Sequence, residues 1–181
     1  ALDAEDTGNR SVAIGFEAAS NLSAGIDGCV AIGYQALDAA VSAGHYTVAI
    51  GQTALGGLTS GEGNVAVGYA ALLAEADGDG STAVGYQALT AQTGTTGNVG
   101  NTAVGYGAGA AITLGQFNIA IGKSALSTED VGNSSVAIGY AAMANQNSDS
   151  NNEETGNVGI GHYASLYNVT GQNNTYLGYK A

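Results

Sequence analysis

The stretch Val30-Ala31-Ile32-Gly33-Tyr34-Gln35-Ala36-Leu37 decides the fold, because close copies of it recur from one end of the chain to the other. In ten places a β-branched residue starts a four-residue run that ends in Gly, usually with Ala second and with Ile or Val third. The ten glycines are Gly15, Gly33, Gly51, Gly68, Gly85, Gly105, Gly122, Gly139, Gly161 and Gly178. Subtraction gives spacings of 18, 18, 17, 17, 20, 17, 17, 22 and 17 residues. A period of this length indicates a repeat protein in which each period is one structural unit.

Each four-residue run predicts a short β-strand, because β-branched residues dominate it and side chains two positions apart share a face. In the quoted copy Val30, Ile32 and Tyr34 would lie on one face, with Ala31 and Gly33 on the other. We predict that the large face fills the interior of a coil, and that the Ala/Gly face allows the close approach of a partner subunit.

The rest of each unit carries the chain back to the next strand. An x-Ala-Leu or x-Ala-Ala segment predicts a second, weaker apolar element, and loops rich in Gly, Asn and Ser, such as residues 58–64, predict turns. Roughly 17 residues accommodate two short strands and two turns, which make one coil of a solenoid. The sequence thus predicts an all-β solenoid of about ten coils, with 17 to 22 residues in each, as a single repeat domain over residues 1–181. At about 4.8 Å per coil, the rod would be about 45 to 50 Å long.

The composition narrows the classes of function. The chain has 15 Asp and Glu against three Lys and Arg, and its formal charge of −12 would be repelled by nucleic acid and by anionic lipid. A single Cys excludes an internal disulfide and the ligand spacing of a zinc finger. With 45% hydrophobic and only 10% charged residues, the chain also differs from disordered sequences. No apolar run approaches the roughly 20 residues that a membrane-spanning helix needs.

Three copies of the motif carry a resemblance to known families. The run Asn133-Ser134-Ser135-Val136-Ala137-Ile138-Gly139 resembles the head repeats of trimeric autotransporter adhesins. The runs Gly33-Tyr34-Gln35-Ala36-Leu37 and Gly85-Tyr86-Gln87-Ala88-Leu89 resemble the longer repeats of phage tail fibres and related surface fibre proteins, whose spacing is closer to that seen here. The resemblance spans all ten units. It implies a left-handed parallel β-roll, a homotrimer of chains packed side by side in a rod or fibre, and presentation and adhesion without catalysis.

The two ends of the chain match each other. If Ala181 were followed by another copy of Ala1, the distance between repeat glycines would be (181 − 178) + 15 = 18 residues, which lies inside the observed range. Two interpretations stay open, a segment of a longer fibre and a subunit that stacks head to tail. Both predict axial continuation, because the uncapped ends of a solenoid expose unpaired strand edges.

Catalytic and cofactor chemistry finds little support, and we predict a protein that is not an enzyme and binds no cofactor. His45 and His162 stand alone at different places in the repeat, and Cys29 occupies a slot that holds Asn, Thr or Ser in other units. Asp77 and Asp79 could serve calcium from one flexible turn, but no Glu completes an EF-hand and we favour a solvated turn. The other acids are expected in loops along the edges of the rod.

An aromatic residue usually follows the repeat glycine directly, as in Phe16, Tyr34, Tyr69, Tyr86, Tyr106, Tyr140 and Tyr179. We predict that these rings stack from coil to coil in the core, with a glycan-binding strip as the alternative.

An ice-binding face would need an unbroken row of Thr or acids. The candidates Thr47, Thr82, Thr102 and Thr175 are interrupted by Ser11, Cys29, Asn64, Asn118, Ser135 and Asn157.

Two units are longer than the rest, through residues 93–97 and through residues 145–154. Insertions in solenoids form loops on one face, which is often the binding face. We therefore predict a lateral contact or receptor site in the second loop, at Asn147, Asp149, Asn151, Glu153 and Glu154.

The function that follows is a structural and adhesive module of an extracellular, cell-surface or virion fibre that attaches to a cell-surface or glycan receptor. The alternative is a filament subunit that polymerises head to tail.

Overall fold

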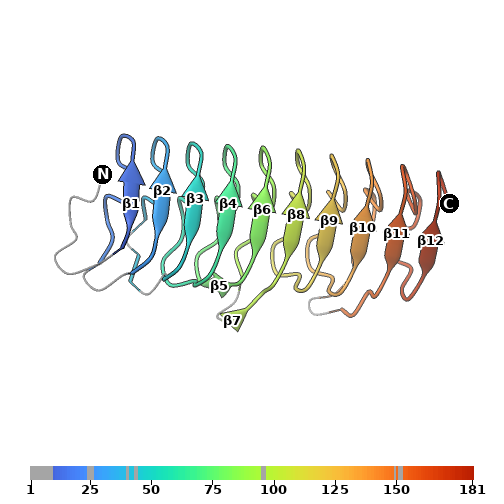
Figure 1. Cartoon of the computed structure of the whole chain (residues 1–181). Coiled ribbons are helices and arrows are strands. Elements are labelled where there is room, and N and C mark those ends of the chain that lie inside the picture. The colour runs from blue at the N-terminus through green and yellow to red at the C-terminus, as the bar shows by residue number, and fades with distance from the viewer. Residues whose placement is uncertain are drawn as a thin grey trace.

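The chain is an all-β parallel solenoid of about nine turns. The computed structural model describes residues 10–23, 27–39, 41–42, 45–94, 97–148, 150 and 153–181, and these contain no helix. Figure 1 shows the coils following one another along a rod, with β1 and β12 at opposite ends.

One short strand from each coil joins a ten-stranded parallel sheet, in the order in which the strands occur along the chain. These strands are β1 (Val12–Ile14), β2 (Val30–Ile32), β3 (Val48–Ile50), β4 (Val65–Val67), β6 (Thr82–Val84), β8 (Thr102–Val104), β9 (Ile119–Ile121), β10 (Val136–Ile138), β11 (Val158–Ile160) and β12 (Thr175–Leu177). Equivalent residues pair in register, so that Val12 lies opposite Val30 and Ala13 opposite Ala31. The strand positions predicted from the repeat are confirmed.

A second, two-stranded sheet lies at the edge of the rod where the main strands begin. It joins β5 (Gly78–Asp79) to β7 (Gly97–Asn98), and β7 belongs to the first of the two long units. The first insertion is therefore paired with the coil beside it.

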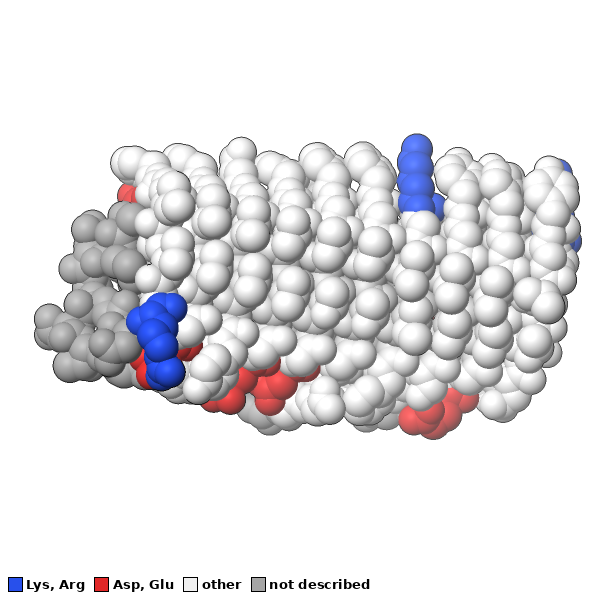
Figure 2. Space-filling view, in the orientation of Figure 1, with Lys and Arg blue, Asp and Glu red and all other residues white. Residues whose placement is uncertain are grey.

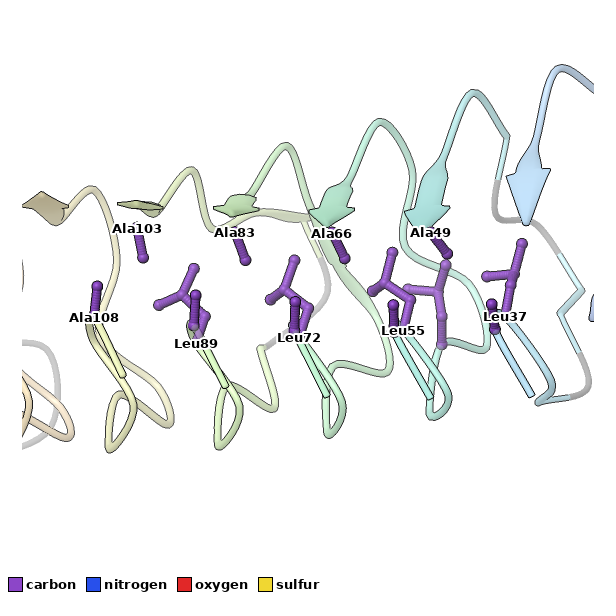
Figure 3. Packing of buried hydrophobic residues seen from close by; sticks show 14 of the residues in the cluster. Leu37, Ala49, Leu55, Ala66, Leu72, Ala83, Leu89, Ala103 and Ala108 are labelled. Atoms are coloured by element: carbon purple, nitrogen blue, oxygen red, sulfur yellow. The ribbon is translucent and has the colours of Figure 1, made fainter. Parts of the chain in front are cut away.

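The prediction that the large side chains fill the interior is wrong, because the alanines point inward. Ala49 and Ala66 are completely buried, whereas Val12 and Ile14 at the start of the sheet are 45% and 58% exposed. Figure 3 shows the strand alanines pointing toward leucines from the segment that faces the sheet. Leu55 and its equivalents in neighbouring coils are also fully buried and fill the narrow interior. Because interiors pack without voids, a layer of Leu leaves room for only a methyl group from the strand.

The facing segment is not the second strand that we predicted. Gln35 and Leu37 have φ angles of +51° and +53°, and the same two slots have positive φ in the other coils. The backbone nevertheless bonds between coils: the Gln35 N–H donates to the Phe16 carbonyl of the preceding coil at 2.9 Å, and the Leu37 N–H donates to the Ala54 carbonyl of the following coil at 3.0 Å. A left-handed conformation costs a residue with a side chain roughly 1–2 kcal/mol. The ladders between coils must therefore offset a strain that recurs in every unit.

The repeat glycine ends each strand in a conformation that only glycine adopts readily. Its φ lies between +127° and +142° in the ten copies. A Cβ on Gly68 would lie 2.3 Å from the carbonyl oxygen of Gly85 in the next coil, so the glycines also allow neighbouring backbones to touch.

Candidate functional site

The outer face of the ten-stranded sheet is the most extensive candidate interaction surface. Its two rows consist of the first and third residues of each strand, which are Val, Thr, Ile or Leu throughout. Val104 and Ile121, in the middle of the rod, are 38% and 37% exposed. Figure 2 shows charged side chains along the edges of the rod, whereas the face between the edges carries none in this view. An uncharged and mostly apolar surface of this kind is typical of a protein interface.

Threonine forms no continuous row on this outer face. Thr82 and Thr102 are neighbours in register, but Val65 and Ile119 flank them. Thr47 occupies a different slot and is fully buried. The described strands therefore lack the threonine array that an ice-binding face requires.

The aromatic ladder runs along the edge of the rod where the main strands end. Tyr69 stacks on Tyr86 with ring centroids 5.0 Å apart, and Tyr86 stacks on Tyr106 at 4.9 Å. Phe16 and Tyr34 form a separate stack at 5.5 Å. The predicted stacking is confirmed, but the predicted core location is wrong, because Tyr69 and Tyr86 are each 42% exposed. The rings lie at a turn that leaves the coil, whose interior is already filled.

Ring geometry argues against a glycan strip along this ladder. Sugars bind to the faces of aromatic rings, and here the faces of neighbouring rings contact each other and leave mainly edges and hydroxyl groups outward. Lys123 interrupts the ladder, and its Nζ lies 5.6 Å from the ring centroid of Tyr106 and 6.0 Å from that of Tyr140, which allows cation–π attraction.

His162 takes the place of an aromatic residue in the ladder. Its ring stacks on Tyr140 with centroids 5.0 Å apart, which supports a packing role. Tyr163 meets Tyr140 edge-on at 5.2 Å. A side-chain hydrogen bond with Tyr140, together with partial desolvation, raises the pKa of Tyr163 above its ordinary value of 10.0.

The carboxylates of the two calcium candidates, Asp77 and Asp79, accept hydrogen bonds from neighbouring protein groups. Thr59 and Ser60 donate hydroxyl hydrogen bonds to Oδ1 of Asp77, each at 2.6 Å, and these bonds lower the pKa of Asp77 below its ordinary value of 3.8. The backbone N–H of Glu62 donates to Oδ1 of Asp79 at 2.8 Å. Both carboxylates thus tie their turn to that of the preceding coil. Among the described residues, no group of three or more His, Cys, Asp or Glu could hold a metal ion.

Two acids that we predicted in edge loops are instead fully buried, namely Glu75 and Glu129. Both lie seven residues after a repeat glycine, in the slot that Leu58 and Ile112 occupy in other coils. Because Leu58 and Ile112 are fully buried in this slot, it points into the coil, and an acid there needs donors. Oε1 of Glu75 accepts a hydrogen bond from the N–H of Gly78 at 2.8 Å, and its Oε2 accepts one from the side-chain amide of Gln92 at 2.5 Å.

The same polar cluster occurs twice in the rod. The amide of Gln92 also donates to Ser81 at 2.9 Å and its oxygen accepts from Asn101 at 2.9 Å. The amide of Gln146 donates to Glu129 at 2.9 Å and to Ser135 at 3.1 Å, and its oxygen accepts from Asn157 at 2.9 Å. We call these the two Glu–Gln clusters: Glu75, Ser81, Gln92 and Asn101, and Glu129, Ser135, Gln146 and Asn157.

Each Glu–Gln cluster lies at the root of one inserted loop. Gln92 directly precedes the insertion at residues 93–97, and Gln146 stands at the start of the insertion at residues 145–154. Ser148 donates to Glu129 from its backbone N–H at 3.2 Å and from its hydroxyl at 3.0 Å. The buried glutamate therefore holds the first residues of the longer loop in place. The sequence signal was a Glu, and a Gln 17 residues later, in slots that hold Leu or Ile elsewhere.

The second insertion is tied to its neighbours along much of its described length. The N–H of exposed Asn147 donates to the Val169 carbonyl at 2.9 Å. Half-buried Glu153 accepts an N–H bond from Asn133 at 2.8 Å through its carbonyl. Exposed Glu154 accepts from the Ser134 hydroxyl at 2.8 Å through its carboxylate. Asp149 and Asn151, which we predicted in the same site, lie outside the described residues.

Cys29 and His45 each take part in a hydrogen bond between adjacent coils. Cys29 is buried, and its N–H donates to the Ser11 hydroxyl at 3.2 Å. His45 Nδ1 accepts the N–H of Asp27 at 3.2 Å. These contacts join adjacent coils.

A cavity of about 440 Å³ lies beside the last coil. Tyr163, Ser165 and Tyr176 contribute to its lining, and the buried Ser165 hydroxyl has no hydrogen-bond partner among the described residues. Tyr176 stands in the strand slot that elsewhere holds Ala or Gly, and Ser165 stands in the facing slot that often holds Leu. A large residue from the strand thus accompanies a small one opposite.

Comparisons of the chain with protein-family models, with curated proteins and with solved structures find no match. Among the described residues there is also no helical segment with the length and hydrophobicity that crossing a membrane requires.

Proposed function

We propose that the chain is a structural and adhesive module of a surface fibre, extracellular or on a virion, in which three copies pack side by side as left-handed β-rolls. The observation that carries the proposal is the uncharged apolar outer face of the main sheet, which extends from β1 to β12. The number of chains and the handedness come from the resemblance of the repeats to adhesin heads and tail fibres.

A second copy is the partner that suits this face best. The face repeats at the strand spacing of about 4.8 Å along the whole rod, and another copy offers the same period, length and polarity. The formal charge of −12 does not oppose this packing strongly, because the acidic side chains seen in Figure 2 gather mainly along one edge of the rod and not on this face. Packing through the large face replaces our prediction of packing through the small one.

Substitution of Ile121→Lys tests the assembly. Ile121 is outward-facing at mid-rod, so a lysine should leave the coil folded but place an unpaired charge in the interface. We expect light scattering with chromatography to report a trimer for the unaltered chain and a monomer for the variant, with the same β-rich circular dichroism. Ala74→Lys, at an exposed position outside the main sheet, is the matched control and should stay trimeric. A monomeric unaltered chain would refute the assembly.

The second insertion is the proposed attachment site, because its exposed Asn147 and Glu154 lie on a loop that the second Glu–Gln cluster anchors. We expect the double substitution Asn147→Ala and Glu154→Ala to weaken attachment about tenfold, as loss of about 1.4 kcal/mol of contacts would. Binding of the chain to immobilised cells or to a glycan array measures this change in attachment. Asn98→Ala, at an exposed position directly after the first insertion, is the control. Unchanged attachment of the double variant would exclude these two side chains.

A further inference from the structure

The tyrosine stack at the centre of the rod combines parallel rings, exposure to solvent and a fixed register. Tyr69, Tyr86 and Tyr106 come from consecutive coils and stack with nearly parallel rings, at interplanar angles of 17° and 5°. Their exposed fractions are 42%, 42% and 54%, so small oxidants in solution can reach them. The backbone also holds them in register, because the Gln87 N–H donates to the Tyr69 carbonyl at 2.8 Å and the Gly107 N–H donates to the Tyr86 carbonyl at 2.9 Å.

We propose that this stack is a site of oxidative cross-linking, at which tyrosines of adjacent coils couple to dityrosine. The co-reactant is a peroxide acting through a haem peroxidase. Each of two phenols gives up one electron and one proton, and the peroxide takes up both electrons and both protons to form two molecules of water. The two phenoxyl radicals then form one carbon–carbon bond between ring carbons ortho to the hydroxyl groups, and loss of the ortho protons to the phenolic oxygens restores both rings.

Geometry makes the coupling selective. A phenoxyl radical on Tyr86 has a second phenol in contact on each side, with centroids at 5.0 Å and 4.9 Å, so coupling needs no large movement of the backbone. Coupling would close a loop between residues 69 and 86 or between residues 86 and 106. It would thereby fasten together the coils of β4, β6 and β8, where the first insertion lies.

The other stacks of the ladder are natural controls. Phe16 and Tyr34 stack at 5.5 Å, but Phe has no phenol to oxidise. Tyr140 stacks on His162, and its contact with Tyr163 is edge-on at 81°.

The test oxidises the full chain with a haem peroxidase and hydrogen peroxide, and reads dityrosine by its blue fluorescence and by mass spectrometry of digested protein. Cleavage at Glu75 separates Tyr69 from Tyr86, so a link joins two otherwise separate peptides. We expect links between residues 69 and 86 and between residues 86 and 106, within one chain. Tyr86→Phe, which keeps a stacked ring, should lose both links, while Tyr34→Phe should retain the full yield.

Three outcomes would overturn the proposal. One is an unchanged yield in Tyr86→Phe. Another is cross-linking dominated by products between chains, seen as bands of higher mass in denaturing gels. The third is an equal yield of the link between residues 69 and 86 when the chain is oxidised in denaturant, which would show that the folded stack contributes nothing.

Discussion

Substitution of Gly85→Ala is expected to lower the free energy of unfolding by about 3 to 5 kcal/mol, enough to prevent folding of a marginally stable chain. Gly85 has a φ of +142°, which disfavours any side chain, and a Cβ there would lie 2.4 Å from the carbonyl oxygen of Gly105. The clash is with backbone, which cannot rotate away. Denaturant unfolding followed by circular dichroism measures the loss.

Two other glycines separate the causes of this effect. Gly178 shares the conformation, with a φ of +127°, but has no atom within 4 Å of the added Cβ, so Gly178→Ala reports backbone strain alone. Gly107 has a φ of +61° and the same open surroundings, and Gly107→Ala should cost about 1 kcal/mol. If all three substitutions had equal effects, contact between the coil backbones would not be the reason for the repeat glycine.

Substitution of Glu129→Gln is expected to cost about 2 to 4 kcal/mol. Glu129 is fully buried and accepts from Gly132 N–H at 2.8 Å, from Gln146 at 2.9 Å and from two groups of Ser148. An amide in its place sets one donor against another donor, because its –NH2 group would face either the Gly132 N–H or the Gln146 amide. We expect a lower midpoint of denaturant unfolding and faster proteolysis within residues 145–154.

The first Glu–Gln cluster supplies an internal check on this result. Glu75→Gln should have a comparable effect and should release the first insertion instead of the second, because Glu75 has the equivalent contact with Gln92. Glu154→Gln is the surface control and should change stability by less than about 0.5 kcal/mol. Equal losses of stability at Glu129 and Glu154 would mean that burial of the carboxylate does not determine the size of the effect.

The period of the sequence was sufficient to predict the strands but not to choose the inner face. Val30, Ala31 and Ile32 alternate in size, and the alternation shows that two faces exist without showing which one is inside. The choice depends on the width of the coil, which is set by the segment opposite. Leu37 and its equivalents were the missing clue, because the leucine that recurs in most facing segments leaves space for Ala only.

The candidate site was predicted in part for a similar reason. Length differences between units located both insertions, but the assumption that acids lie in loops concealed Glu75 and Glu129. A comparison of slots, in which these two residues align with Leu58 and Ile112, would have placed them inside. The positive φ of Gln35 and Leu37 could not be predicted, because neither residue favours that conformation on its own and the ladders between coils impose it.

Because the coils pack closely, buried side chains determine which coil can follow which along the rod. Gly159 replaces the strand alanine at β11, and a Cβ there would lie 2.6 Å from Cγ of Met143, which fills the leucine slot one coil earlier. In the coils of β3, β4 and β6 Ala faces Leu each time, but the buried Glu75 of the β4 coil needs the amide of Gln92 from the β6 coil, so those two coils could not exchange places either. The coils that carry Met143, Gly159 and Tyr176 could not, because each is shaped to one neighbour. The order of the coils is therefore fixed where a buried side chain needs a partner in the next coil, as at Glu75 and Gln92, and where the coil interior changes shape toward β12.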